Sequence, residues 1–559
     1  MASSHQPLAQ RITPPFLRRA FEDRPTPKGV KRVIAYGSVS IGMMVAALNM
    51  TVVSAALPRI AADLEGLDYF HWVFTGYIVM AAASLPIFGK LSDMYGRKLF
   101  FCVGLVILMV GSVLAGSAQD IFQLSIYRAF AGIGAGALIA NSMAIVGELF
   151  TPIEQPKWRA LNQGVFAIAN ISGPLVGGLL TDHLSWRWVF FMNIPVAAIA
   201  LTYAMAVLPP FRSGRRRHQI DFLGAGLLLA FVLPLLIGVS LGGRQFPWGS
   251  WQVLSLLFFS GVMMVAFFAQ EKRAPEPILP LAAFKNGPFA ISNLAYLLIG
   301  LGLFGTMLNL PLFVQGVAGR SATESGLFLM PMTISSFIAG MLAGQLLSRW
   351  GRYKLVAIFS TATATLGLYL LSAMDANATR TIITINVVIM GMGMGIAFPL
   401  FMVIATNAVP QRMLGVATSS AAFMRNFGGT IGVAVMGTMV GARFTSVFNS
   451  DISGPARAAM ERAQVALPTN PQALLDVDTV TSIESALIGV GGVQHLPAIL
   501  ETMRVSLAAA ISDSFLLGTV FMGITVVACL FLREIPLRTS NNLDPEETVE
   551  PSSPVSASK

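Results

Sequence analysis

Apolar runs of about 20 residues, the length that an α-helix needs to cross the hydrocarbon of a bilayer, recur along almost the whole chain. None of them shows the alternation of apolar and polar residues that a β-barrel strand requires. The runs therefore predict an all-α integral membrane protein with about fourteen spans. The predicted spans are residues 33–57, 70–88, 99–117, 122–147, 161–181, 187–208, 222–242, 251–270, 289–315, 324–347, 355–374, 381–406, 414–441 and 514–532.

The composition agrees with this prediction and excludes several classes of function. Of the 559 residues, 55% are hydrophobic and 11% are charged, whereas a soluble domain has about 25% charged residues. The net charge of +10 comes from short clusters between the apolar runs, so it does not indicate nucleic-acid binding. The histidines are scattered, and Cys102 and Cys529 lie inside apolar runs, so we expect no metal site, no cofactor and no enzyme active site. No phosphate-binding loop of an ATPase is present.

The distribution of Lys and Arg predicts the orientation of the chain. Clusters of cations alternate with single cations along the connections between spans. Because cations accumulate on the cytoplasmic side, we expect both termini in the cytoplasm and hence an even number of spans. Residues 1–32 would form a cytoplasmic tail without a removable signal peptide, and residues 536–559 a disordered cytoplasmic tail. Residues 442–513 would form a long outside loop, either a partly ordered linker or a functional cap, with amphipathic helices at about 455–467 and 496–512.

One short segment occurs twice along the chain. GKLSDMYGRK begins at Gly89, after the second predicted span, and GQLLSRWGRYK begins at Gly344, after the tenth. A shift of 255 residues superimposes two glycines, a leucine and an arginine of the two segments. Such a repeat is typical of two homologous halves. It predicts a six-helix bundle at 33–208, an inserted hairpin of two helices with flanking loops at 209–288, and a second six-helix bundle at 289–535.

The chain carries five short signatures, which are GKLSDMYGRK (89–98), YRAFAGIGAG (127–136), SGPLVGG (172–178), SWRWVFFMNIP (185–195) and RNFGGTIGVA (425–434). In type and order they resemble signatures of the major facilitator superfamily, and within it of the fourteen-span drug/proton antiporters. The resemblance covers about residues 33–535. It implies the major facilitator fold, with two six-helix bundles plus two inserted helices, and transport by alternating access.

The resemblance assigns a gating role to the repeated loop. Asp93 can pair with Arg97 or accept hydrogen bonds from the N-terminus of a neighbouring helix. Such contacts would lock the halves together and break as the protein rocks, although topogenic charge is the alternative for Arg97 and Lys98. The predicted gating loop consists of Gly89, Asp93, Gly96, Arg97 and Lys98, with the counterparts Gly344, Gly351 and Arg352 in the second half.

The fifth span carries the motif that the resemblance assigns to antiporters. Its small or kinking residues are Gly173, Pro174, Gly177 and Gly178. They let helices approach and bend, for packing, for conformational change or for both.

Asn49 is a departure from the family pattern. In the first span, where AALNMTVVSAALP (46–58) matches the family at Thr51, the family usually has Asp in place of Asn49. An amide cannot bind and release a proton, and no other carboxylate lies in the middle of a predicted span. The carboxylates considered as substitutes fall at span ends or in loops, namely Asp63, Asp68, Asp221, Glu324, Asp375 and Asp513.

Polar residues within the spans predict a central cavity for substrate and coupling. They are Asn49, Thr51, Arg128, Asn141, Asn170, Arg425 and Asn426. Snorkelling to the outer surface is the alternative for Arg128. A cavity with two arginines and several amides but no acid suits neutral or anionic amphipathic substrates better than dications.

These observations predict a monomeric, multi-pass exporter in the plasma or inner membrane. It would move amphipathic small molecules, drug-like or lipid-like, with protons as the coupled ion. Export of a lipid or a dedicated metabolite to the outer leaflet, assisted by residues 442–513, is one alternative. Uptake of a metabolite on the same fold is another.

Overall fold

The computed structural model describes residues 29–64, 71–151, 153–209, 221–243, 246–275, 277–279, 281–320, 322–350, 352–410, 413–465, 471, 474 and 477–536. Almost all of the two predicted tails, and Gly351 of the predicted gating loop, lie outside these residues. Within them the chain is helical, and β-structure is limited to one isolated bridge between Gly242 and Phe246.

Long helices make up the first part of the chain. In order they are α3 (Val30–Asp63), α4 (His71–Tyr95), α5 (Arg97–Gly116), α6 (Ile121–Leu149), α7 (Gln155–His183), the short α8 (Trp188–Phe191), α9 (Asn193–Val207), α10 (Phe222–Leu241) and α11 (Trp251–Glu271). The second part contains η2 (Leu281–Lys285), α12 (Gly287–Leu312), η3 (Phe313–Val317), α13 (Ala322–Trp350), α14 (Lys354–Ser372), α15 (Arg380–Asn407), α16 (Leu414–Asp451), α17 (Gly454–Arg462), α18 (Val477–Gly489), η5 (Val493–His495) and α19 (Leu496–Leu530).

The helices confirm the all-α membrane fold. Thirteen of them, among the described residues, are long and apolar enough to cross a bilayer. The remaining predicted span, 161–181, lies in α7, which has 29 residues but is less apolar because it carries Lys157, Arg159 and several amide side chains. A helix of that length covers about 43 Å, which is more than the hydrocarbon thickness of about 30 Å. Its polar residues therefore need protein neighbours instead of lipid.

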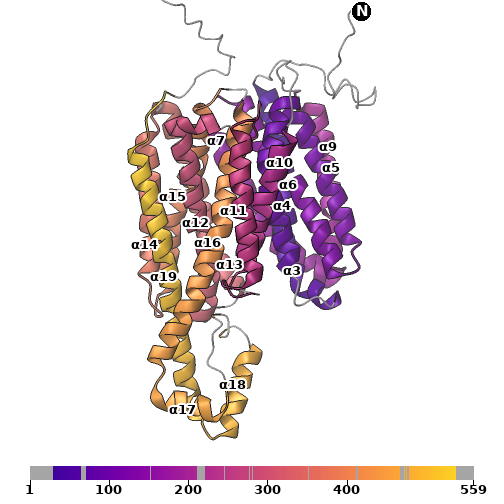
Figure 1. Cartoon of the computed structure of the whole chain (residues 1–559). Coiled ribbons are helices and arrows are strands. Elements are labelled where there is room, and N and C mark those ends of the chain that lie inside the picture. Colours follow the sequence, from indigo (N-terminus) through magenta and orange to yellow (C-terminus); the bar gives the residue numbers. More distant parts are fainter. Residues whose placement is uncertain are drawn as a thin grey trace, which may run out of the picture.

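The helices form two groups with a hairpin between them (Figure 1). Helices α3 to α9 pack on one another, and so do α12 to α16 together with α19. The hairpin of α10 and α11 packs mainly on itself, and α10 also contacts α4 of the first group and α16 of the second. An apolar cluster joins the three parts, with Phe231 and Phe267 of the hairpin near Phe423.

The described chain begins and ends at the same end of the bundle (Figure 1). We name this the inner end, and we name the opposite end, where α17 and α18 lie, the outer end. At the inner end Arg32 donates two hydrogen bonds to Glu154, of 3.0 and 2.9 Å. Although partial burial acts in the opposite direction, the hydrogen bonds from Arg32 and Thr151 lower the pKa of the Glu154 carboxyl below its usual value.

The prediction of a loop at 442–513 was wrong at both of its ends. Helix α16 continues to Asp451 and α19 already begins at Leu496, so the predicted separate helix at 496–512 is the first half of α19. At 1.5 Å per residue, the 38 residues of α16 extend about 57 Å, well beyond a bilayer. We name residues 442–513, with α17 and α18, the outer extension.

The described ends of the outer extension continue the helices α16 and α19 because apolar side chains continue past the membrane-spanning part. Phe444 and Phe448 of α16 and Ile499 and Met503 of α19 are buried in one cluster. The charges that ended the predicted spans pair with each other, since Arg443 Nε lies 2.7 Å from Asp513 Oδ2. Polar residues that end a hydropathy run therefore do not end the helix.

Candidate functional site

The first element of the site is a seal at the inner end between α4 and α16. Asp93 accepts hydrogen bonds from the backbone N–H groups of Gly415, at 2.9 Å, and Val416, at 2.8 Å. These N–H groups belong to the first turn of α16, which has no intrahelical partners for them. A carboxylate there also interacts favourably with the positive end of the helix dipole. Asp93 of the first half thus caps a helix of the second.

Ion pairs hold the capping carboxylate in place. Arg97 Nη2 lies 2.6 Å from Asp93 Oδ1, and Arg97 Nε also binds the carboxylate of Glu148 at the end of α6. The Arg97 and Asp93 side chains are only 3% and 5% exposed. Lys98 donates to the carbonyl oxygen of Met205 at 2.7 Å, within the first half. We expected Asp93 and Arg97 from the sequence, but not the pairing of Arg97 with Glu148, because these two residues are 51 positions apart in the chain.

Two glycines allow the close approach of α4 and α16. A Cβ at Gly89 would collide with Ser419 Oγ and lie 2.8 Å from the carbonyl oxygen of Gly415. A Cβ at Gly415 would lie 2.6 Å from the carbonyl oxygen of Gly89. Gly96, before α5, has φ of 108°, which side chains rarely adopt. Four of the predicted loop residues are thus needed, Gly89 and Gly96 for shape and Asp93 and Arg97 for charge.

The repeated loop of the second half is placed differently. Gly344 is buried on α13 and Arg352 is exposed, whereas Gly351 lies outside the described residues. In the second half, α13 precedes the repeated loop as α4 does in the first. Its contact with α7 therefore corresponds to the contact of α4 with α16. There a Cβ at Gly340 would lie 3.3 Å from Ala160 Cβ, and one at Gly164 would lie 3.0 Å from the ring of Phe337. Within the part of the chain that the structure describes, this contact is formed by Gly340, Ala160, Gly164 and Phe337, without a charged cap like that of the first half.

The direct hydrogen bonds between the two halves gather toward the inner end. Those between described residues include the two bonds to Asp93 and a long one, 3.4 Å, from Thr406 Oγ1 to Gln155 Oε1. The close glycine contacts described above lie from the inner end to the middle of the helices. The molecule is therefore closed at its inner end in this conformation.

Asn49 and Arg128 lie next to each other inside the first half. Arg128 donates from Nη1 to Asn49 Oδ1, and Asn49 Nδ2 donates to Ser112 Oγ at 3.0 Å. The guanidinium carbon lies 4.2 Å from the centre of the Tyr77 ring. Arg128 also donates to the carbonyl oxygen of Val73 at 3.3 Å.

The burial of this pair decides between the alternatives for Arg128. Arg128 and Asn49 are both 0% exposed, so Arg128 does not snorkel to the surface. All the described partners of the pair belong to the first half, however, and none of them to the interface that we expected the pair to line. Arg128 Nη2 is buried without a hydrogen-bond partner among the described residues, so this guanidinium is incompletely satisfied.

The predicted fifth-span motif forms a contact between α7 and α3. Thr51 Oγ1 donates to the carbonyl oxygen of Ala169 at 3.0 Å. A Cβ at Gly173 would collide with Thr51 Oγ1, and one at Gly177 with the carbonyl oxygen of Val52, whereas one at Gly178 meets nothing within 4 Å. Gly173 and Gly177 are thus required by packing and Gly178 is not. The side chains of Asn170 and Pro174 lie outside the described part of the structure.

Arg425 faces a different environment in the second half. Its guanidinium carbon lies 5.6 Å from the centre of the Phe398 ring, and its Nε is buried without a hydrogen-bond partner among the described residues. Tyr296 donates its hydroxyl to the backbone carbonyl of Phe398. Asn426, the next residue on α16, is partly buried. Asn141 of α6 is fully buried, and its Oδ1 has no described partner.

Most of the carboxylates considered as substitutes for the missing acid are at helix ends. Asp63 ends α3, Asp221 caps α10 and Glu324 lies in the first turn of α13. Asp513 is the exception, because α19 begins before it. Asp375 follows α14, and Asp68 lies outside the described residues.

Sequence reasoning overlooked Glu271, a carboxylate that is only 3% exposed at the end of α11. It accepts hydrogen bonds from the N–H groups of Ile278, at 3.3 Å, and Leu279, at 3.1 Å. Glu271 therefore holds the connection to α12. Its position next to Lys272 and Arg273 made it look like part of an exposed charge cluster.

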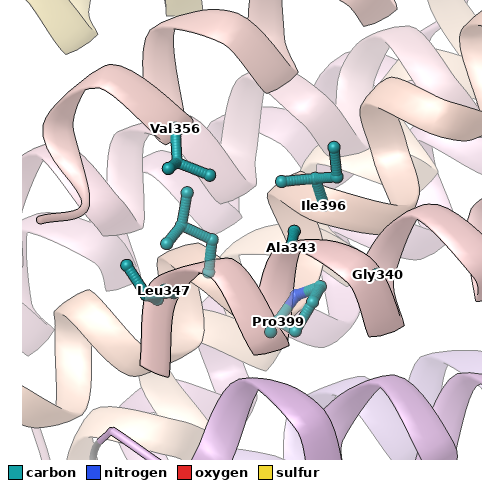
Figure 2. Close-up of a pocket in the computed structure, with 8 residues that line it drawn as sticks. Gly340, Ala343, Leu347, Val356, Ile396 and Pro399 are labelled. Atoms are coloured by element: carbon teal, nitrogen blue, oxygen red, sulfur yellow. The ribbon is translucent and has the colours of Figure 1, made fainter. Parts of the chain in front are cut away.

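A small cavity lies within the second half, among α13, α14 and α15 (Figure 2). The residues around it are Gly340, Ala343, Gly344, Leu347, Val356, Ile396, Pro399 and Leu400. None of them has a polar side chain, so the cavity offers nothing that would recognise a polar or charged group.

Comparison with known proteins gives consistent matches over the length of the chain. The family model of the Major Facilitator Superfamily matches residues 39–433. Multidrug transporter protein MdtP of Bacillus subtilis (strain 168) is 32% identical over 534 residues, covering 93% of this chain and 96% of that protein. Multidrug resistance protein 3 of the same organism is 33% identical over 500 residues, covering 89% and 95%. Efflux pump FUS6 of Gibberella fujikuroi is 28% identical over 445 residues, covering 78% of each chain.

Solved structures share the fold at low sequence identity. The human organic anion transporter MFSD10 superimposes with a TM-score of 0.55 at 13% identity, covering 89% of this chain and 100% of that one. The proton:xylose symporter XylE superimposes with a TM-score of 0.54 at 12% identity, covering 90% and 96%. At these identities the likeness concerns the arrangement of helices alone.

Proposed function

The chain belongs to the Major Facilitator Superfamily, and we propose that this multi-pass membrane protein exports amphipathic small molecules by alternating access, driven by proton influx. The proposal includes a location in the plasma or inner membrane, the inner end in the cytoplasm and a monomeric state. Relatives named as multidrug transporters and efflux pumps support the direction of transport.

The seal between Asp93 and α16 is the observation that carries the proposal. It joins the two halves through two backbone hydrogen bonds and a close contact between glycines. Such a seal can open as the halves rock, because water replaces the hydrogen bonds at the inner end. In this conformation the seal is closed, which corresponds to the state that releases substrate outward.

Proton coupling in this chain must use a group other than residue 49. Asn49 has no ionisable proton, and its neighbour Arg128 remains charged under all relevant conditions. We propose the carboxylates of the inner seal, the buried Asp93 side chain and the partly buried Glu148, as the groups that respond to protons. Protonation of Asp93 would weaken both its ion pair with Arg97 and its cap on α16.

Transport into proteoliposomes with an imposed pH gradient tests this function. We expect an amphipathic fluorophore to move against its own gradient when protons flow the other way. The same vesicles with the gradient collapsed by a protonophore are the control. Equal rates with and without the gradient would remove the proton coupling, and no transport of any amphipath would remove the function itself.

Delivery of a lipid or a lipid-like metabolite to the outer leaflet is the second candidate. It is favoured by the outer extension, where Ile488, Val490 and Val493 are exposed apolar residues near α18. The experiment that separates the two candidates is given with the outer extension in the Discussion.

A further inference from the structure

The chain leaves its last membrane-spanning helix as a non-helical segment that is bonded to the second half. After α19 ends at Leu530, residues 532–536 lie outside any helix. Leu532 is fully buried in the apolar cluster of the second half, which fixes the start of the segment. We name residues 533–536, which lie at the inner end of the bundle, the strap (Figure 1).

Tyr353 holds the strap through two hydrogen bonds. Its hydroxyl donates to the carbonyl oxygen of Arg533 at 2.8 Å and accepts from the N–H of Ile535 at 2.7 Å. One side chain thus satisfies a donor and an acceptor of a backbone that has no helical partners for them. Tyr353 is 1% exposed and directly precedes α14, so the packing of the second half fixes its position.

The repeated segment contains an equivalent contact in the first half. The shift of 255 residues superimposes Tyr353 on Lys98, and Lys98 donates to the carbonyl oxygen of Met205 near the end of α9. Helices α9 and α19 are the last helices of the two halves. In the first half the acceptor belongs to the helix. In the second half the bonded groups follow the helix, so they can detach without unwinding it.

The far end of the strap is bonded to α15. Asn407 Nδ2 donates to the carbonyl oxygen of Pro536 at 3.2 Å. Asn407 is the last residue of α15 and is 4% exposed. The strap therefore connects three places in the second half, which are the end of α19, the start of α14 and the end of α15.

The end of α15 and the start of α16 meet the first half at the inner end. Thr406, the neighbour of Asn407, has its Oγ1 3.4 Å from Gln155 Oε1 of α7. The first turn of α16 donates its two N–H groups to Asp93 of α4. The residue that the strap holds thus lies between the two places where the second half is hydrogen-bonded to the first.

We propose that the strap keeps the inner ends of α15 and α16 in the position that closes the molecule, so that release of the strap favours opening at the inner end. Each neutral hydrogen bond changes an equilibrium by roughly two- to tenfold. Three such bonds give the strap a measurable influence, and water at the inner end can replace them when it detaches. This conformational role is independent of the compound transported and of the coupled ion.

Labelling of Val416→Cys by a water-soluble maleimide tests the strap in the full-length protein, with both native cysteines replaced by Ala. Val416 is 3% exposed in the closed molecule. Tyr353→Phe keeps the ring and removes the hydroxyl with its two bonds, so we expect labelling about tenfold faster. Asn407→Ala removes one bond and should raise the rate about threefold.

Tyr203→Phe is the matched control for the loss of a hydroxyl. Tyr203 belongs to α9 of the first half, and its hydroxyl donates to the carbonyl oxygen of Ile34 at 3.2 Å, away from the strap. The rate at Val416→Cys should therefore stay unchanged. An equal rise in Tyr203→Phe and Tyr353→Phe would overturn the proposal.

The double variant distinguishes one strap from two unrelated losses of packing. If the strap acts as a unit, Tyr353→Phe already releases it, and the addition of Asn407→Ala should raise the rate by less than about twofold. Independent effects would instead multiply to about thirtyfold over the native protein. Multiplication of the two effects, or an unchanged rate in Tyr353→Phe, would overturn the proposal.

Cys529 shows whether the second half remains folded in these variants. It is 0% exposed on α19, so in proteins that keep it as the single cysteine its labelling should not change. A parallel rise at Cys529 would mean that Tyr353→Phe loosens the whole second half, which would contradict a strap. If Gly89→Ala speeds labelling of Val416→Cys and Tyr353→Phe does not, the inner seal stands and the strap fails.

Discussion

At the scale of the residue, Arg128 shows how the protein buries a charge without an acid. Its partners are an amide oxygen, a backbone carbonyl and the face of Tyr77. Neutral acceptors and an aromatic ring stabilise a guanidinium less than a carboxylate does. Asn49 therefore has a definite role, which is to supply the acceptor closest to the Arg128 charge.

Asn49→Asp should be tolerated and should change the pH dependence of transport. A carboxylate in place of the amide oxygen would pair with Arg128 Nη1, so we expect the thermal unfolding midpoint in detergent to stay equal or to rise. The new group can take up a proton, and protonation would release Arg128. Transport in proteoliposomes should therefore depend more steeply on pH than that of the native protein.

Asn49→Leu is the matched control for this variant. It removes the acceptor without adding charge, so we expect it to lower stability by about 2 kcal/mol, the value of a hydrogen bond to a charged group. An unchanged pH profile in Asn49→Asp would show that position 49 does not influence coupling.

At the scale of the element, glycines decide where helices can touch. The contact of α4 with α16 depends on Gly89 and Gly415, and that of α3 with α7 on Gly173 and Gly177. Bilayer lipid is as apolar as most side chains, so helices associate mainly through close packing and interhelical hydrogen bonds. Both contacts combine close packing at glycines with an interhelical hydrogen bond. Asp93 makes this bond in the first contact and Thr51 in the second.

Gly89→Ala should weaken the inner seal. The added Cβ would collide with Ser419 Oγ, and the backbone carbonyl of Gly415 prevents a simple shift. Overpacking of this kind costs about 1–3 kcal/mol, which would shift the population toward molecules that are open at the inner end.

A cysteine at Val416 reports this opening. Val416 is 3% exposed in the closed seal, and the native cysteines, Cys102 and Cys529, are both buried and can be replaced by Ala. We expect Gly89→Ala to raise the rate at which a water-soluble maleimide labels Val416→Cys about tenfold. Gly226→Ala, on a glycine with open space around it, should leave the rate unchanged. Equal labelling in all three proteins would contradict the proposed seal.

Gly177→Ala and Gly178→Ala compare a tightly packed and an open position of the same motif on α7. At Gly177 the new methyl group would meet the backbone carbonyl of Val52, which cannot move aside, so we expect a loss of about 1–3 kcal/mol in unfolding free energy. At Gly178 the new methyl group meets nothing within 4 Å, so the unfolding free energy should change by no more than about 0.5 kcal/mol. Thermal unfolding in detergent measures both, and equal losses would show that the motif does not act through packing.

At the scale of the whole molecule, the two additions to the twelve core helices behave differently. The α10–α11 hairpin lies against both halves, and Trp248 Nε1 in its connecting loop donates to Thr438 Oγ1 of α16 at 3.0 Å. This bond ties the hairpin to the second half near the outer end. The outer extension is continuous with two core helices, but the described hydrogen bonds of α17 stay within the extension.

Replacement of residues 453–494 by a short Gly/Ser linker should preserve export of small amphipaths. The linker joins the ends of α16 and α19, whose contact through Phe444, Phe448 and Ile499 remains. Transport of a fluorescent amphipath and of a fluorescent lysolipid is compared in proteoliposomes. Loss of lysolipid transport alone would favour the lipid exporter, and loss of both would show that the extension is part of the transport machinery. Removal of all of 442–513 would cut into both helices and is not a valid test.

The sequence by itself determined which segments are helical and membrane-spanning, because the length of an apolar run is a local property. The repeat around Gly89 and Gly344 likewise predicted two related halves, and Asp93 and Arg97 were identifiable from their motif. Only the tertiary structure decided that Asp93 caps α16 and that Asn49 meets Arg128. These contacts depend on how each helix is rotated about its axis. A helix that is apolar all round carries no stripe in its sequence that reveals this rotation, so it is set by packing between residues far apart in the chain.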